Sequence, residues 1–432
     1  MLLQFSVKNF LSIKDECSLS LLAANSIKDC EQNLIDVELA GLKGVKVLKG
    51  LGIYGPNASG KTSVLKALDI MKFLVVQSAA ILPAEHLPYT PFALCEDCLQ
   101  NPTELFVSFV HDSVRYEYEF HYHARRVVFE ELSAFPSGKR QRWFTRKVLI
   151  EDESPGLGVE EFKFSTHLNV SNEVRNTVRP NSLLLSMGAQ FNNDKLFNVY
   201  RWFQNECLVV NSTNQFDLLE KSAELFSNKS NKEYHQFIQM MDNADLGISG
   251  LDIDVHERDV PLVLETQVEG AAPQIQQVMG REVTHDVRFI HKAESGHECA
   301  VSLDNESSGT QVLFRFGGMF FDALNAGKTV VIDELDTSLH PLLERALLKM
   351  FFSAEVNKNG AQIIFVSHNP LLLSGDVLRR DQIWFTEKDV HGVTHLYPLT
   401  DFSPRKQESL LAGYMSGRYG GIPIVPDGLG LG

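Results

Sequence analysis

The octapeptide G-P-N-A-S-G-K-T, Gly55 to Thr62, constrains the fold of this chain more than any other stretch. It fits the pattern G-x-x-x-x-G-K-[ST] in full, between an apolar strand-like run and a helical pattern. Glycines let the backbone wrap closely around a phosphate so that successive N–H groups point inward, and the following helix adds its dipole. We therefore expect the phosphate loop of a nucleotide-binding α/β protein, with ATP as the ligand.

Individual side chains of this loop receive separate tasks. Lys61 is expected to bridge the β- and γ-phosphates, and Thr62 is expected to offer its hydroxyl to Mg²⁺. Other nucleotide contacts are expected from the remaining polar and glycine residues of the loop and from the first helical turn, namely Gly55, Asn57, Ser59, Gly60 and Ser63.

A second acidic motif, T-V-V-I-D-E, Thr329 to Glu334, supplies the partner that a phosphate loop needs. Its β-branched run predicts a buried parallel strand, and Asp333 stands at the carboxyl end, where α/β sheets place ligands. We expect this strand to neighbour the strand of the phosphate loop, with Asp333 holding the metal. Glu334 can polarise the attacking water as a general base.

Two further stretches complete the set of candidates. I-I-F-V-S-H-N-P, Ile363 to Pro370, predicts a strand with His368 just past its end, which suits a sensor of the γ-phosphate. N-E-S-S-G-T-Q, Asn305 to Gln311, has the composition of a loop or linker, yet an apolar run follows it at once. Taken alone, it is either a solvated connection or a loop shaped to hold a ligand.

The composition limits the classes of protein that need to be considered. With 44% hydrophobic and 22% charged residues, the chain is typical of soluble globular proteins. A net charge of −15 argues against a chain that coats nucleic acid by charge alone, so DNA binding stays open. The six scattered cysteines suit a reducing compartment, and neither a secretory signal nor a membrane-spanning run is visible. We expect a cytoplasmic protein.

Hydrophobic periodicity divides the chain into four segments. Residues 1–165 are expected to form an ATPase lobe with the phosphate loop and an antiparallel β subdomain. Residues 166–250 are expected to form a compact, mainly helical insertion, since no heptad pattern is sustained there. Residues 251–400 are expected to complete the ATPase lobe, and 401–432 form a C-terminal tail.

The motifs, in this order, resemble the ABC-type ATPase head of SMC, RecF and related DNA-repair proteins. In that resemblance Gly55–Thr62 is Walker A, V-V-I-D-E is Walker B, and L-D-T-S-L-H-P, Leu335 to Pro341, is similar to the D-loop. Asp336 is then the acidic residue of the D-loop, and His368 is the switch histidine. The Q-loop has two candidates, Gln77 and the stretch 88–94.

The stretch E-S-S-G-T-Q falls where this family has its L-S-G-G-Q signature. Ser308 takes the serine position, Gly309 the first glycine and Gln311 the last position, whereas Thr310 departs from the second glycine. In the family the signature caps the γ-phosphate that is bound to the opposite subunit. The resemblance therefore implies a head-to-tail homodimer with ATP sandwiched between subunits, and it leaves a larger assembly open.

More narrowly, the chain resembles the RloA/AbiL-like ATPases of bacterial phage defence, which include AriA, the ATPase of the PARIS system. The resemblance depends on L-L-Q-F-S-V-K-N-F-L-S-I-K at the start, E-S-S-G-T, D-E-L-D-T-S-L-H-P and Y-M-S-G-R-Y-G-G-I-P near the end. It implies a separately encoded effector, a nuclease of the TOPRIM type or another toxin, and a phage-derived trigger.

Three hypotheses follow. The first is an ATP-hydrolysing switch of abortive infection that controls an effector. The second is a RecF-like DNA-binding repair ATPase. Short insertions fit this hypothesis, whereas the acidic net charge fits it less well. The third is a scaffold in which ATP only joins subunits, and the intact Glu334 and His368 count against it.

Overall fold

The structure is a computed structural model, and it describes residues 1–39, 41–150, 159–210, 215–244, 246–266, 274–293 and 295–423. The chain divides into two compact units. The first comprises Met1–Val210, Ala323–Thr337 and Glu344–Gly432, and the second comprises Asn211–Asp322 and Ser338–Leu343. The last part of the predicted tail, 424–432, lies outside the described residues.

A six-stranded, mainly parallel sheet is the centre of the first unit. Its strands, in spatial order, are β11 (Cys207–Val210), β15 (Thr329–Ile332), β16 (Gln362–Val366), β5 (Gly50–Tyr54), β17 (Ile383–Lys388) and β18 (Thr394–Pro398). Only the outer pair, β17 and β18, is antiparallel. The strands β15, β16 and β5 are buried along their whole length, as expected of parallel strands whose two faces are covered.

The strand order corrects one expectation from the sequence. Strand β15 ends just before Asp333, and strand β5 ends at the phosphate loop. The sequence predicts that these two strands are neighbours. Instead β16 lies between them and pairs with both. The sequence spacing could not reveal this, because a crossover connection can return a strand to any position in a parallel sheet.

A seven-stranded antiparallel sheet forms the other layer of the first unit. Its order is β10 (Val159–Phe164), β9 (Gln141–Ile150), β8 (Val127–Phe135), β7 (Val114–Tyr122), β6 (Thr103–His111), β1 (Leu2–Lys8) and β2 (Cys17–Ser20). One cluster of buried side chains contains residues of both sheets and of helix α1 (Lys61–Gln77), including Phe5, Ile53 and Leu68. The predicted α/β architecture with an antiparallel β lobe is therefore confirmed.

Shorter elements complete the first unit. Its further helices are α2 (Glu96–Gln100), α3 (Asn172–Thr177), α4 (Leu184–Gln190), α5 (Asp194–Arg201), α9 (Pro341–Phe352, from Glu344 onward) and α10 (Leu410–Met415). Single turns are η1 (Glu31–Asn33), η2 (Trp202–Glu206), η4 (Pro370–Ser374), η5 (Arg380–Gln382) and η6 (Leu399–Phe402), and a small ladder pairs β3 (Leu34–Asp36) with β4 (Lys46–Leu48).

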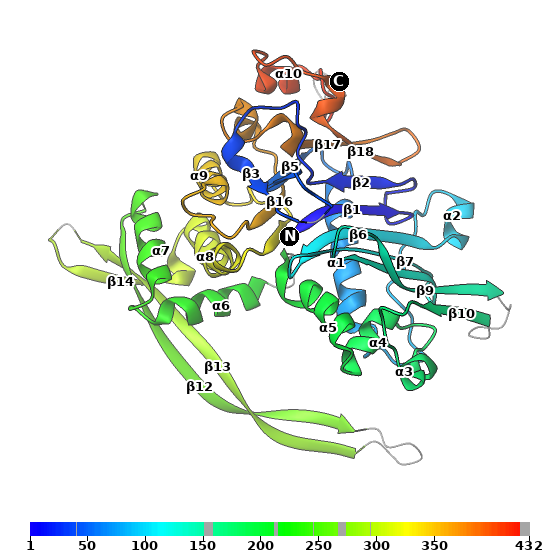
Figure 1. The fold of residues 1–432 in the computed structure, drawn as a ribbon. Helices are drawn as coiled ribbons and strands as arrows, with labels where there is room; N and C mark the ends of the chain where they lie inside the picture. The colour runs from blue at the N-terminus through cyan, green and yellow to red at the C-terminus, as the bar shows by residue number, and fades with distance from the viewer. Residues whose placement is uncertain are drawn as a thin grey trace, which may run out of the picture. The chain divides into compact units, whose positions relative to one another are not determined.

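The second unit combines helices with a long β-hairpin. It contains α6 (Gln215–Ser227), α7 (Lys232–Asn243), β12 (Ile248–Thr266), β13 (Gln274–Lys292), β14 (Glu298–Ser302), η3 (Leu303–Asn305) and most of α8 (Ser308–Ala326). Strands β12 and β13 pair along their full length, and Figure 1 shows them as an extended ribbon. Phe226 stacks on Phe237 at 4.4 Å, and both rings contact Phe314 of α8, so an aromatic cluster joins the three helices.

Glycine in α8 allows its close approach to α6. A Cβ added at Gly318 would lie 2.7 Å from the Cα of Ser222. The Ser222 hydroxyl accepts a hydrogen bond from the Gly318 N–H at 2.9 Å and donates one to the Arg315 carbonyl at 3.0 Å. Any larger residue at 318 would push the two helices apart.

The unit boundaries differ from the segments expected from the sequence. Helices α3 to α7 do lie within 166–250, but the first unit extends through Val210, because β11 pairs with β15 in the parallel sheet. The second unit also takes in the hairpin and the start of α8, which the sequence placed in the ATPase lobe. The four-residue strand C-L-V-V was too short to be recognised among helical segments.

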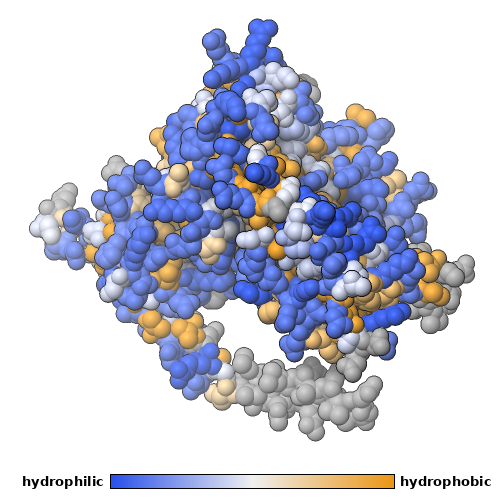
Figure 2. Space-filling model, in the orientation of Figure 1, coloured by the Kyte–Doolittle hydropathy of each residue, from blue (hydrophilic) through white to orange (hydrophobic). Residues whose placement is uncertain are grey.

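The surface is consistent with the composition. On the face shown in Figure 2, hydrophilic residues predominate and hydrophobic ones occur in small groups. Among the residues that the structure describes, no helix combines the length and the apolar character that crossing a membrane requires.

Candidate nucleotide-binding site

The phosphate loop connects the end of β5 to the start of α1, as the sequence predicts. Ala58 and Gly60 have φ angles of 62° and 105°, so the loop turns through the left-handed region twice before the helix begins. A Cβ added at Gly60 would lie 2.1 Å from the Thr394 Oγ1, and one at Gly55 would lie 2.5 Å from the Thr386 Oγ1. Space requires glycine at both positions, and the left-handed backbone conformation requires it at Gly60 as well.

Neighbouring hydroxyl groups fix the shape of this loop. The Ser59 Oγ pairs with the Thr386 Oγ1 at 2.6 Å, and the Thr394 hydroxyl donates to the Ser59 carbonyl at 3.0 Å. At the start of α1, the Ser63 Oγ lies 2.9 Å from the Ser12 Oγ. The loop is therefore held from β17, from β18 and from the segment after β1.

Lys61 is the cation at the centre of the loop. Its side chain is buried, and its ammonium group donates to the carbonyl oxygens of Gly55 and Pro56 at 2.8 and 2.9 Å. Burial lowers its pKa, while the carboxylates of Asp333, Asp336 and Glu334 act in the opposite direction. The ammonium group thus lies inside the ring of the loop, where phosphate oxygens can replace the two carbonyl groups.

Asp333 and Thr62 form the candidate metal site. The Thr62 hydroxyl hydrogen-bonds to the Asp333 carboxylate, and burial is the main cause that raises the pKa of Asp333. The Asp333 Oδ1 is buried and, among the described residues, has no hydrogen-bond partner. Mg²⁺ in phosphate-transfer sites takes one or two carboxylates together with hydroxyl and phosphate oxygens, so this pair fits that cation.

Glu334, the candidate general base, differs from Asp333 in its surroundings. Its side chain is exposed, and its backbone has a φ of 55°, which is uncommon for a residue other than glycine. The Leu335 N–H donates to the Val366 carbonyl at 3.0 Å and the Thr337 hydroxyl donates to the Glu334 Oε2 at 3.3 Å. These contacts hold a strained turn that presents the carboxylate to solvent, as active sites often do.

His368 follows β16, the strand between the two motif-bearing strands. Its backbone N–H donates to the Asp336 Oδ2 at 2.9 Å, while its side chain is exposed. His368, Gly55 and Asn57 line one cavity of about 510 Å³ together with Tyr414, Met415 and Ile422 from the C-terminal segment. The histidine therefore shares a cavity with the phosphate loop, as a γ-phosphate sensor requires.

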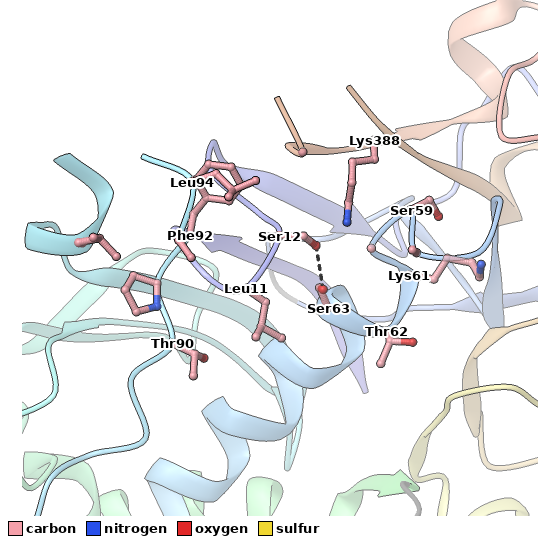
Figure 3. Close-up of a pocket in the computed structure, with 16 residues that line it drawn as sticks. Leu11, Ser12, Ser59, Lys61, Thr62, Ser63, Thr90, Phe92, Leu94 and Lys388 are labelled. Carbon is pink, nitrogen blue, oxygen red and sulfur yellow. Dashed lines mark hydrogen bonds between the residues drawn. The ribbon is translucent and has the colours of Figure 1, made fainter. Parts of the chain in front are cut away.

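A second cavity, of about 800 Å³, also borders the phosphate loop (Figure 3). Ser59, Lys61, Thr62 and Ser63 line one side of it. The opposite side is apolar and includes Leu11, Phe92 and Leu94, while Lys388 lines the cavity on the side of Ser59. Its size and its mixture of apolar walls with a few polar groups are typical of a small-ligand site, and the apolar wall suits a nucleotide base.

The sequence named part of this apolar wall, but only as a candidate for the Q-loop. Of the two Q-loop candidates, Gln77 ends α1, whereas Thr90 to Leu94 within the other stretch line the cavity. Lys388 was not recognised at all, and Tyr414 was noted only as part of the stretch Y-M-S-G-R-Y-G-G-I-P, with no role in the site. Their signal is weak because they belong to short loops and strand ends, which become neighbours only through the sheet order.

The predicted signature lies in the second unit, at the start of α8. Ser308 is exposed, and the Ser307 hydroxyl accepts a hydrogen bond from the Thr310 N–H at 3.2 Å, as an N-cap does. Thr310 is buried, and its own hydroxyl pairs with the Ser307 Oγ at 2.8 Å. Threonine at this position thus supports the helix cap.

The structure brings most of the predicted residues together within one unit. Those that surround the phosphate loop in the first unit are Gly55, Asn57, Ser59, Gly60, Lys61, Thr62, Ser63, Asp333, Glu334 and His368. Ser308 and Gly309 belong to the second unit. A Cβ added at Gly309 would lie 3.0 Å from the Ser338 carbonyl oxygen, so this glycine permits a close contact inside that unit.

Comparisons with known proteins found one matching family and similar solved structures. The profile of the family described as "AAA domain, putative AbiEii toxin, Type IV TA system" matches residues 51–172 and 192–374, well over half of the chain. A solved structure titled "Crystal structure of the SmcHead bound to the C-winged helix domain of ScpA" is similar with a TM-score of 0.35 and 11% identity, over 91% of this chain and 96% of that one. A comparison with curated protein sequences found no match.

Proposed function

This chain belongs to the AAA-domain family of the AbiEii type that matches it, and from this premise we propose that it is an ATP-hydrolysing switch of bacterial antiphage defence. The observation that carries the proposal is the convergence of Lys61, Thr62 and Asp333 at one edge of the parallel sheet, with Glu334 beside them. The abortive-infection character of the family and the narrower RloA/AbiL-like motifs support the defence role.

The residues divide the work of hydrolysis in a way that the geometry supports. Lys61 would exchange its two carbonyl partners for phosphate oxygens, and Thr62 and Asp333 would hold Mg²⁺, which neutralises developing charge on the phosphates. The exposed Glu334 carboxylate would orient the attacking water and accept its proton. His368, positioned by Asp336, would contact the γ-phosphate side of the site.

The partners form the second part of the proposal. Ser308 is exposed at the start of the 19-residue helix α8, whose free N–H groups and dipole suit an anion. We propose a head-to-tail homodimer in which Ser308 and Gly309 of each subunit contact the ATP bound to the other subunit. Such dimers could build a larger assembly. A separately encoded nuclease or toxin would be the effector, released or activated after a phage-derived trigger.

Paired measurements of turnover and protection test the function. Purified chain is expected to hydrolyse ATP in the presence of Mg²⁺, and Lys61→Ala is expected to abolish both turnover and protection of cells against phage. Protection that survives the complete loss of turnover would remove hydrolysis from the switch. Tight, ATP-dependent binding of duplex DNA by the chain alone, at moderate salt, would instead favour the RecF-like alternative.

A further inference from the structure

Glu344 is a carboxylate buried beside the loop that carries His368. It lies in α9 with 0% of its surface exposed. Its Oε2 accepts a hydrogen bond from the Asn369 side-chain amide at 2.7 Å, and the Ser367 hydroxyl also hydrogen-bonds to the carboxyl group. Glu344 therefore contacts the residues on both sides of His368.

The backbone of this loop depends on these contacts. The Asn369 N–H donates to the Ser367 Oγ at 3.0 Å, and the Asn369 Oδ1 accepts from the Leu371 N–H at 3.0 Å, which caps η4. From the opposite side, Asp336 accepts the His368 N–H. Two acidic residues, Asp336 and Glu344, thus hold three consecutive residues after β16.

A purely structural role explains Glu344 poorly. Its Oε1 is buried and has no hydrogen-bond partner among the described residues. Its pKa is raised to about 7, mainly because the carboxyl group is buried and also because the negative charge of Asp336 lies nearby. The phenol of Tyr54 from β5, whose pKa is raised by its own burial and by the Glu344 charge, also lacks a hydrogen-bond partner in the described part of the chain. A glutamine could accept the Asn369 amide without this cost.

The chain contains a matched contrast in Glu130 of β8, which is also fully buried. Glu130 accepts hydrogen bonds from the backbone N–H groups of Leu184 and Leu185 at 2.8 and 3.0 Å and from the Tyr118 hydroxyl at 2.9 Å. Both of its oxygens are satisfied, and Arg146 lies 3.8 Å away. Glu130 has the contacts of a structural carboxylate, whereas Glu344 does not.

We propose that Glu344 is a positioning residue for His368, which it places by holding the Ser367–Asn369 loop through the Asn369 amide. The inference deepens the proposed function, since it assumes that His368 serves ATP hydrolysis. An ionised carboxylate accepts the amide roughly twice as strongly as a neutral acid does. Deprotonation of Glu344 therefore tightens the loop, and protonation loosens it.

The kinetic test compares wild type with Glu344→Gln from pH 5.5 to 8.5. Glutamine reproduces the neutral acid, so the ratio of the wild-type kcat to the variant kcat is expected to rise from about one to about fivefold across this range, with similar KM. Taking the ratio cancels the titration of other groups. Glu130→Gln, the matched control, is expected to lower stability and to give a ratio that does not change with pH.

A measurement without nucleotide provides an independent readout. Hydrogen exchange of residues 362–374, corrected for intrinsic rates, is expected to slow as the pH rises in wild type but not in Glu344→Gln. Asn369→Ala is expected to remove the same pH dependence of exchange. The double variant Glu344→Gln, Asn369→Ala is expected to show the same exchange as Asn369→Ala alone. These data are obtained even where a variant is inactive.

The outcomes separate this inference from the proposed function. If wild type hydrolyses no ATP, the proposed function fails, and the exchange data alone then decide whether Glu344 holds the loop. If wild type is active but the kcat ratio is flat and the exchange of 362–374 is unchanged in Glu344→Gln, the positioning role is wrong. A pH-dependent ratio of the same size in Glu130→Gln would also overturn it.

Discussion

The phosphate loop of the first unit and the signature stretch of the second are two parts of one proposed site, and they are built differently. The phosphate loop is surrounded by Asp333, Glu334 and His368 at the edge of a buried parallel sheet, and hydroxyl contacts hold it from three sides. The signature is the exposed end of a helix, with one capping serine behind it.

This difference indicates what each region can do alone. The phosphate loop has its cation, its candidate metal ligands and an adjoining cavity of about 800 Å³ within a single unit. We propose that it binds a nucleotide without help from the second unit. Within the described residues, the signature offers a helix terminus and the hydroxyl groups of two serines, which are enough to complete an anion site but not to form one.

The largest expected effect tests whether the two regions meet between subunits. Lys61→Ala and Ser308→Arg are each expected to reduce ATP turnover by 100-fold or more, on the order of the loss of a transition-state contact. An equal mixture of the two variants is expected to recover about a quarter of wild-type turnover, since half of the dimers are mixed and each has one intact site.

The control is the mixture of Lys61→Ala with a Lys61→Ala, Ser308→Arg double variant, in which no site is intact. Mixed dimers must be shown by differently tagged subunits. If tagged mixed dimers form and yet recover no turnover, the proposal that Ser308 acts on the opposite subunit is wrong.

The next effect separates binding from chemistry inside the first region. Glu334→Gln is expected to lower kcat by about 100-fold to 10,000-fold, because it removes the proton acceptor, while ATP affinity stays within a few fold of wild type. Calorimetry and single-turnover hydrolysis measure the two quantities. A variant that loses affinity as strongly as turnover would show that Glu334 binds the nucleotide or its metal instead.

The two regions also differ in how far the sequence could predict them. The loop Gly55–Thr62 and the strand before Asp333 were predictable, because phosphate and metal binding restrict both residue types and spacing. The position of β16 between β5 and β15 was not, since no local pattern encodes strand order. The boundary at Val210 and the apolar wall around Phe92 depend on contacts between distant segments, which periodicity does not contain.

A smaller effect concerns the stability of the first unit, and it tests Glu344. The pKa of this carboxyl rises from 4.5 to about 7 on folding, so the folded chain binds the proton more tightly than the unfolded chain. Its contribution to stability is therefore complete below about pH 4.5 and is lost as the pH rises to about 7.

Glu344→Gln removes this dependence. Relative to wild type, its free energy of unfolding is expected to increase between pH 5 and pH 8 by up to about 3 kcal/mol. Denaturant unfolding at both pH values measures the change. In the wild type, the ionised carboxylate would then lower the stability while it holds the loop around His368 more firmly. If the difference in the free energy of unfolding between the two proteins does not vary with pH, this interpretation is wrong.

The smallest effect compares one helix cap in the first unit with one in the second. Ser307→Ala removes the hydroxyl that caps α8, and Ser171→Ala removes the one that caps α3, where the Ser171 Oγ accepts the Val174 N–H at 3.3 Å. Each change is expected to cost about 1 kcal/mol in the free energy of unfolding. Only Ser307→Ala is expected to lower ATP turnover, by about fivefold, because its helix terminus faces the γ-phosphate of the partner subunit in the proposed dimer. Equal turnover in the two variants would mean that the start of α8 serves folding alone, and the proposed site would then end at the phosphate loop.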